Sequence, residues 1–247
     1  DACVSCSIMG RGRWWCAKSA APPSCFPIAC PRAGGGALYP ATASGGLGMV
    51  AVRAFIAVEL PDSLQQQLAE VQRRLRQELR DLPIRWVRPE SIHLTLKFLG
   101  MVPAAQIDEI IAALRGLTLE RGPFMFIVEG LGCFPDPRHP RVIWVGVSDP
   151  TRALAGFQRL VEASMQKLGY PPEDRPYQPH LTLARVSRDA TPVHHRQIAE
   201  VIARTPVGQL GEVRVEEITL MRSDLHPEGA IYTPIIRLPL RGKGNPD

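Results

Sequence analysis

The sequence predicts a mixed α and β fold of two similar lobes, each built from strands and two helices and joined as one compact unit. The first observation is a repeat: Arg88-Pro89-x-x-x-His93-Leu94-Thr95-Leu96 recurs 87 residues later as Arg175-Pro176-x-x-x-His180-Leu181-Thr182-Leu183. The second is that apolar, β-rich runs alternate with segments whose apolar residues are spaced by three and four, in the same order around both copies. A duplicated order of elements indicates a duplicated lobe.

The first lobe begins after Met49 with the apolar, β-rich run from Val52 to Leu60. Pro61-Asp62-Ser63 then opens a segment with apolar residues at helical spacing, which predicts a capped amphipathic helix. The other elements expected in this lobe are a strand from Ile92 to Leu99, a helix through Ile107, Ile110, Ile111 and Leu114, and a strand from Phe124 to Leu131.

The second lobe repeats this order. Ile56 and Val58 map at the same offset onto Ile143 and Val145, which lie in an expected strand from Arg141 to Val147. The elements expected after it are a helix with Leu154, Phe157, Leu160, Val161 and Leu168 that ends at Gly169, a helix around Ile198, Val201 and Ile202, and strands near Val213 to Met221 and Ile231 to Leu240.

Residues 1–48 differ in composition from the rest of the chain. They hold eight glycines, five prolines and five of the six cysteines, without a helical or alternating apolar period. Such a segment cannot bury enough apolar surface to offset its ordering entropy, so we expect a disordered leader before a two-lobed domain spanning 49–247. Because the chain does not begin with Met, one interpretation of this leader is translated sequence upstream of the true start at Met49.

The composition excludes several classes of protein. No apolar run approaches the ~18 residues of a membrane-spanning helix. Cys133 is the only cysteine beyond residue 30, so a disulfide framework is not expected and a cytoplasmic location is predicted. Residues 49–247 carry 25 basic and 23 acidic side chains, a balance unlike that of proteins that coat a polyanion. We therefore expect any nucleic acid to be bound at one local site and not along an extended surface. We also expect the protein to be a monomer.

The repeated motif carries the chemistry. Side chains alternate between the faces of a strand, so His93, Thr95 and Lys97 are expected on one face and the apolar residues between them on the other. His180 and Thr182 are expected to repeat this arrangement. Two imidazoles near neutral pKa can act as acid and base in one phosphoester transfer, while two threonine hydroxyls donate to the oxygens where charge accumulates. This chemistry requires no metal and no cofactor.

Five segments carry a resemblance to a known family: RAFIAVELP, RWVRPESIHLTLKFLG, GCFPDPRHPRVIWVGV, PPEDRPYQPHLTLARV and LMRSDLHPEGAIYTPI. They resemble the RNA 2′,3′-cyclic phosphodiesterase family, also called 2′-5′ RNA ligase, within the two-histidine (2H) phosphoesterase superfamily, over about residues 50–240. The resemblance implies a bilobal α+β fold with a pseudo-two-fold axis, in which two antiparallel sheets flanked by helices enclose a central cleft. It also implies hydrolysis of a terminal 2′,3′-cyclic phosphate to a 2′-phosphate.

By this analogy His93 is the proton donor and His180 the proton acceptor, although the repeat alone makes them equivalent. Arg185 is associated with the phosphate site in the family, but alternation puts it opposite His180, so a bulge or the strand end must reorient it. The other residues considered for substrate binding are Thr95, Thr182, Lys97, Arg141 and Tyr177, with Arg138, His139, Trp86 and Ser223 as weaker contacts. His194 and His195 lack a third ligand at metal spacing and are interpreted as surface residues.

Three functions remain open at this stage. The first is the RNA 2′,3′-cyclic phosphodiesterase, with 2′-5′ joining as the same chemistry in reverse and RNA with cyclic phosphate ends, tRNA fragments among them, as the partner. The second is a non-catalytic module that binds RNA ends or nucleotides. The third is a cyclic phosphodiesterase of a small metabolite. A single His-Leu-Thr-Leu is most simply interpreted as a strand whose histidine has no catalytic role. The duplication argues against this, because packing would constrain the leucines and not the histidine and threonine.

Overall fold

A computed structural model describes residues 51–226 and 229–242, so the expected leader lies outside the described residues. The helices are α1 (Asp62–Glu78), α2 (Ile107–Glu120), α3 (Ala153–Lys167) and α4 (Pro192–Arg204), with short 3-10 turns at Pro89–Ser91 and Ala104–Gln106. The strands are β1 (Ala51–Glu59), β2 (Ile84–Trp86), β3 (His93–Pro103), β4 (Phe124–Phe134), β5 (Val142–Ser148), β6 (His180–Val186), β7 (Gly211–Val215), β8 (Glu217–His226) and β9 (Gly229–Pro239).

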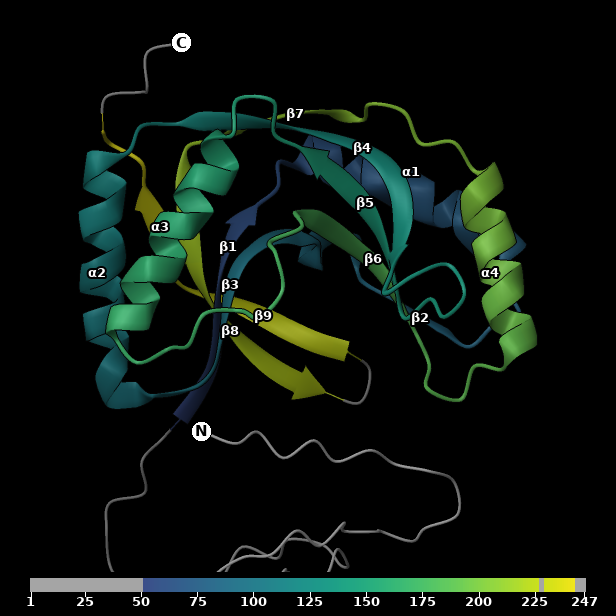
Figure 1. The fold of residues 1–247 in the computed structure, drawn as a ribbon, viewed down its shortest axis with the longest axis horizontal. Helices are drawn as coiled ribbons and strands as arrows, with labels where there is room; N and C mark the ends of the chain where they lie inside the picture. The colour runs from purple at the N-terminus through teal and green to yellow at the C-terminus, as the bar shows by residue number, and fades with distance from the viewer. Residues whose placement is uncertain (1–50, 227–228, 243–247) are drawn as a thin grey trace, which may run out of the picture. The chain divides into compact units, whose positions relative to one another are not determined.

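The strands form one curled antiparallel sheet in the order β7-β4-β5-β6-β3-β1-β8-β9, and β2 pairs with β6 beside this path (Figure 1). The α+β class with antiparallel strands is confirmed. The two sheets expected for the two lobes are joined into one, because β3 of the first copy pairs with β6 of the second at Leu94 and Leu181. Helices α2 and α3 pack together beside one half, and α4 lies beside the other (Figure 1).

The core follows the apolar periods of the sequence. Helix α1 buries Leu64, Leu68, Val71 and Leu75, and helix α3 buries Leu154, Phe157, Val161 and Met165. The expected helix at residue 62 forms, but its start has no side-chain cap: Pro61 is the N-cap residue and makes no side-chain cap hydrogen bond. The strand expected near Val213 to Met221 is interrupted at Glu216, which gives β7 and β8.

Candidate functional site

Each repeated histidine is the first residue of its strand, and each is held in the same way. The Nδ1 of His93 lies 2.8 Å from the carbonyl oxygen of Ser91, and the Nδ1 of His180 lies 2.7 Å from that of Gln178. A carbonyl only accepts, so both contacts require a proton on Nδ1. Each neutral ring therefore presents an unprotonated Nε2, the nitrogen that can take up or release a proton during a reaction.

The threonines share the face of the histidines. In the ladder between β1 and β3, Glu59 lies opposite His93 and Ala57 lies opposite Thr95. In the ladder between β5 and β6, Gly146 lies opposite His180 and Trp144 lies opposite Thr182. All four motif side chains are half-buried, whereas the leucines between them are fully buried. The expected division of the motif into a buried leucine face and an opposite face that carries the histidines and threonines is confirmed.

Both motif strands contain a β-bulge one residue after the threonine. Leu96 has no partner on β1, and Leu183 has no partner on β5. A bulge shifts every later residue of the strand to the other face. Arg185 therefore lies on the same face as Thr182. This confirms the prediction that a bulge or the strand end reorients it.

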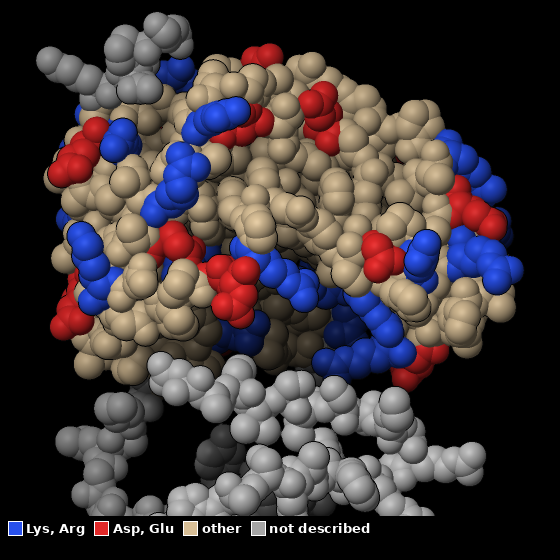
Figure 2. All heavy atoms as spheres, viewed as in Figure 1, with Lys and Arg blue, Asp and Glu red and all other residues tan. Residues whose placement is uncertain are grey.

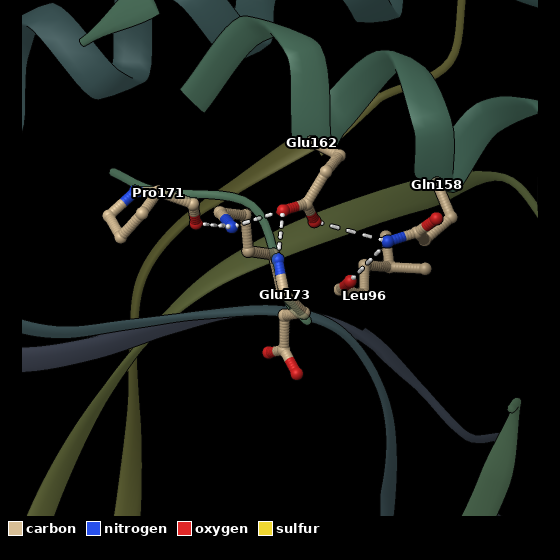
Figure 3. Close-up of polar contacts among 6 residues, drawn as sticks. Leu96, Gln158, Glu162, Pro171 and Glu173 are labelled. Atoms are coloured by element: carbon tan, nitrogen blue, oxygen red, sulfur yellow. Dashed lines mark hydrogen bonds and ion pairs between the residues drawn. The ribbon is translucent and has the colours of Figure 1, made fainter. Parts of the chain in front are cut away.

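The same bulge overturns the expectation for Lys97. It lies opposite the core residue Ile56, and its side chain is only 1% exposed. The Nζ pairs with Glu162 of α3 at 2.6 Å and donates to the carbonyl oxygen of Pro171 at 2.8 Å (Figure 3). The prediction that Lys97 faces the substrate with His93 was wrong, because simple alternation was assumed through a position where the strand bulges.

Phe98 is a residue of this face that the sequence argument missed. It is the equivalent of Arg185 at the 87-residue offset and lies opposite Phe55, so the bulge turns it to the face of Thr95. Its side chain is 51% exposed, which is unusual for phenylalanine. Applying the repeat offset to Arg185 is the signal that could have found it.

Burial and charge set the pKa values of both histidines. Burial lowers the pKa of His93, and the charges of Arg185 and His180 lower it further, while the Ser91 carbonyl and the Glu59 carboxylate oppose them. Burial also lowers the pKa of His180, as does Arg185, while the Gln178 carbonyl opposes them. Because one arginine acts on both imidazoles, the two histidines belong to one site.

Aromatic rings supply much of this burial. The rings of Phe55 and Tyr232 lie 4.7 and 4.9 Å from that of His93, centroid to centroid. The ring of Phe134 lies 4.9 Å from that of His180, and Trp144 lies at 6.4 Å. Rings this close restrict each imidazole to a narrow range of orientations and remove water from its flanks.

Comparison with known proteins decides the family. The family model described as "LigT like Phosphoesterase" matches this chain twice, at residues 58–144 and 145–232. Each match covers one copy of the repeated motif. The chain belongs to the LigT-like phosphoesterase family. The α+β antiparallel fold expected from the resemblance is confirmed, with its two expected sheets joined into one.

Curated relatives and solved structures agree with this family assignment. The RNA 2′,3′-cyclic phosphodiesterase of Methanothermobacter thermautotrophicus is 37% identical over 182 residues, 74% of this chain and 95% of the relative. That of Aquifex aeolicus is 33% identical over 197 residues, 78% of this chain and the whole relative. Among solved structures, Escherichia coli LigT in complex with 3′-AMP has a TM-score of 0.61 at 25% identity, covering 77% of this chain and 99% of that one.

Two buried glutamines support the bulges of this LigT-like phosphoesterase, and they do so crosswise. Gln72 of α1 donates to the carbonyl oxygen of Leu183 at 2.9 Å and to that of Val87 at 2.8 Å. Gln158 of α3 donates to the carbonyl oxygen of Leu96 at 3.4 Å. The helix of each copy thus donates to the bulged carbonyl of the other copy, and the Leu183 carbonyl also accepts from the backbone N–H of Val87 at 2.9 Å.

The remaining candidates divide by their surroundings. Tyr177 packs against the core and donates from its hydroxyl to the carbonyl oxygen of Thr95 at 3.1 Å, which ties the approach to the second motif onto the first. Burial raises the pKa of this hydroxyl. Arg141 donates to the carbonyl oxygen of Ser187 at 2.9 Å, and its charge acts on His195 rather than on either motif histidine.

The weaker candidates have mainly structural contacts. The guanidinium of Arg76 covers the ring of Trp86 at 5.2 Å. The loop residues Arg138 and His139 donate from their backbone to Asp136. Ser223 is buried.

The adjacent histidines of α4 have separate environments. His194 shares a capping box with Thr191 at the start of the helix. The expectation of a surface residue was wrong for His195, which is 5% exposed. It lies on the face that α4 turns toward the core, four residues after the N-cap residue Thr191.

The described surface is hollowed between the two halves, and lysine and arginine side chains gather along the rim of this hollow (Figure 2). Within residues 51–226 and 229–242, no three His, Cys, Asp or Glu side chains are grouped to hold a metal ion. In the same part of the chain no helix is long and apolar enough to cross a membrane.

Proposed function

We propose that this LigT-like phosphoesterase is an RNA 2′,3′-cyclic phosphodiesterase in which His93 is the acid and His180 the base. The observation that carries the proposal is the matched pair of imidazoles. Each donates from Nδ1 to a carbonyl two residues upstream, each presents Nε2, and one arginine acts on both. The names of the relatives support the same reaction and the same substrate class.

The reaction divides between the two histidines. His180 accepts a proton at Nε2 from a water molecule, whose oxygen attacks the phosphorus of the cyclic phosphate. The bond from phosphorus to the 3′ oxygen breaks, and His93 donates its Nε2 proton to that oxygen. The product carries the phosphate on the 2′ oxygen. With an RNA 5′ hydroxyl attacking the phosphorus in place of water, the same steps form a 2′-5′ linkage.

The threonines and Arg185 would stabilise the charge that builds on the non-bridging oxygens. Hydroxyls and a guanidinium already positioned on the reactive face need no reorganisation at the transition state, which is the condition for effective electrostatic stabilisation. Phe98, which is exposed on the same face, would contact the RNA itself. Since two imidazoles supply both proton transfers, we propose that the reaction needs no metal.

The test uses three substrates. A cyclic-ended oligonucleotide, a 2′,3′-cyclic mononucleotide and a linear 3′-phosphate oligonucleotide are incubated with the full chain before and after dialysis against EDTA, and products are identified by phosphorus NMR. We expect a 2′-phosphate from the cyclic-ended RNA, undiminished by EDTA. Binding of that RNA without turnover would favour a non-catalytic module. Turnover of the mononucleotide alone would favour a small-metabolite enzyme, and activity restored only by a metal would contradict the two-imidazole mechanism.

A further inference from the structure

The two halves of the site carry different residues opposite their histidines. Glu59 lies opposite His93 in the ladder between β1 and β3, and at the 87-residue offset its counterpart Gly146 lies opposite His180. Residues directly opposite in an antiparallel pair have Cβ atoms about 4.5–5.5 Å apart. His93 therefore has a carboxylate as its cross-strand neighbour, and His180 has none.

Glu59 is fixed rather than loose. Arg237 of β9 donates to both of its carboxylate oxygens, at 2.6 and 3.1 Å, and the hydroxyl of Thr219 donates to one of them at 2.8 Å. The arginine and the hydroxyl hold the pKa of this carboxyl below its ordinary value, so Glu59 is ionised at neutral pH. Three contacts from two neighbouring strands keep a negative charge beside the first imidazole.

The second half cannot hold such a group. A Cβ at Gly146 would come within 2.8 Å of the carbonyl oxygen of Glu129, closer than real Cβ atoms approach. The Trp144 ring takes up the neighbouring space, and a Cβ on Gly132 would overlap that ring. The asymmetry is therefore built into the backbone of β4 and β5.

We infer that Glu59, held by Arg237 and Thr219, is a positioning residue that distinguishes the two histidines by stabilising the protonated form of His93, and so selects it as the acid. The role of His93 as the acid rests on the proposed function. The stabilisation of its protonated form by Glu59 does not. The charged and titratable groups facing His93 are Glu59 on β1, His180 and Arg185 on β6, and Tyr232 and Arg237 on β9. Of these, Glu59 alone carries a negative charge at neutral pH.

The experiment measures the titration of both histidines directly, by NMR of their Cε1 signals in the full chain without substrate. In Glu59→Gln, we expect the pKa of His93 to fall by roughly 0.5 to 1 pH unit, since the carboxylate is lost and Arg237 is left unneutralised, while that of His180 stays within experimental error. In Arg237→Gln, which leaves the carboxylate unneutralised, we expect the pKa of His93 to rise. The opposite signs cannot come from general destabilisation.

Glu217→Gln is the matched control. Glu217 is a carboxylate that also lies near Arg237, at 3.8 Å, but it does not face His93. It should leave both titrations unchanged, and Glu59→Asp should restore most of the wild-type value. An unshifted His93 in Glu59→Gln, or equal shifts of both histidines, would overturn the inference.

Activity separates the inference from the proposed function. In Glu59→Gln, the alkaline limb of the pH profile for cyclic-ended RNA should move to lower pH, because that limb reports loss of the acid's proton. If the NMR shifts occur but the wild-type chain hydrolyses no cyclic phosphate, the proposed function fails and the electrostatic asymmetry stands. If the enzyme is active and the acid limb moves instead, His93 is the base and the inference fails.

Discussion

Leu94 and Leu181, which occupy the same position in the two copies of the repeat, pair with each other where β3 meets β6. An approximate two-fold axis therefore passes beside this pair. A histidine precedes each leucine and a threonine follows it, so the two motifs meet where β3 and β6 pair. Arg185 lowers the pKa of both histidines, so the two motifs that meet here share one site.

This arrangement predicts strongly coupled effects of the two histidines. His93→Ala and His180→Ala should each lower turnover of cyclic-ended RNA by roughly 10²- to 10⁴-fold, the contribution of one general acid or base, with little loss of binding. The double variant should lose far less than the product of the single losses, because both groups act in one transition state. Single-turnover rates and filter binding measure the two effects. Near wild-type turnover by either single variant would contradict the paired assignment.

The repeat made the histidines and threonines predictable, because identical residues at a constant offset point to equivalent strands. It could not predict the β-bulges, since Leu96 and Leu183 look like ordinary strand leucines and nothing local marks the extra residue. The face of Lys97 was therefore mistaken, and Phe98 was missed. The joining of two expected sheets into one depends on the pairing of Leu94 with Leu181, a long-range contact that no local pattern encodes.

The crossed glutamines yield a second prediction. Gln72→Leu removes two hydrogen bonds and leaves the carbonyls of Val87 and Leu183 without this buried donor, so we expect a loss of about 1–3 kcal/mol in the free energy of unfolding. Since the bulge at Leu183 orients Arg185, kcat/KM per folded molecule should also fall. Urea denaturation and steady-state kinetics test both.

Gln66→Leu is the control for Gln72→Leu, because Gln66 lies on the same helix with its side chain exposed. It should change the free energy of unfolding by no more than about 0.5 kcal/mol, the usual range for surface substitutions. Loss of stability in Gln72→Leu without any change in kcat/KM would show that the bulge does not depend on this glutamine.

The corrected position of Lys97 makes a third prediction. Lys97→Met removes the buried cation of the contact with Glu162, whose carboxylate also accepts from Gln158 and the Glu173 backbone (Figure 3). We expect a loss of about 3 kcal/mol, at the lower end for breaking a buried pair because Glu162 is partly exposed. KM for cyclic-ended RNA should stay the same in the folded protein. A large rise in KM at unchanged stability would return Lys97 to the substrate site.

Among the residues that the structure describes, Arg185 is the one side chain whose charge acts on both imidazoles, so the sign of the effect of its removal can be predicted. Its positive charge lowers the pKa of His93 and of His180. In Arg185→Met both pKa values should therefore rise, and both limbs of the bell-shaped pH profile should move to higher pH. The shift should be a few tenths of a pH unit, because Arg185 is exposed and screened by solvent.

The same variant should lower kcat/KM at the optimum by roughly 10²-fold or more, the cost of losing one donor to the transition-state oxygens. Arg185→Lys keeps the charge but loses the planar fork, so its limbs should stay near the wild-type positions while most of kcat/KM is still lost. Arg188→Met removes another exposed arginine, three residues further along, and should change neither quantity. If Arg185→Met moved only one limb of the pH profile, the arginine would act on one histidine alone. That result would contradict the single site shared by both histidines. If Arg188→Met matched its effects, the loss would belong to the general charge of the surface and not to this position.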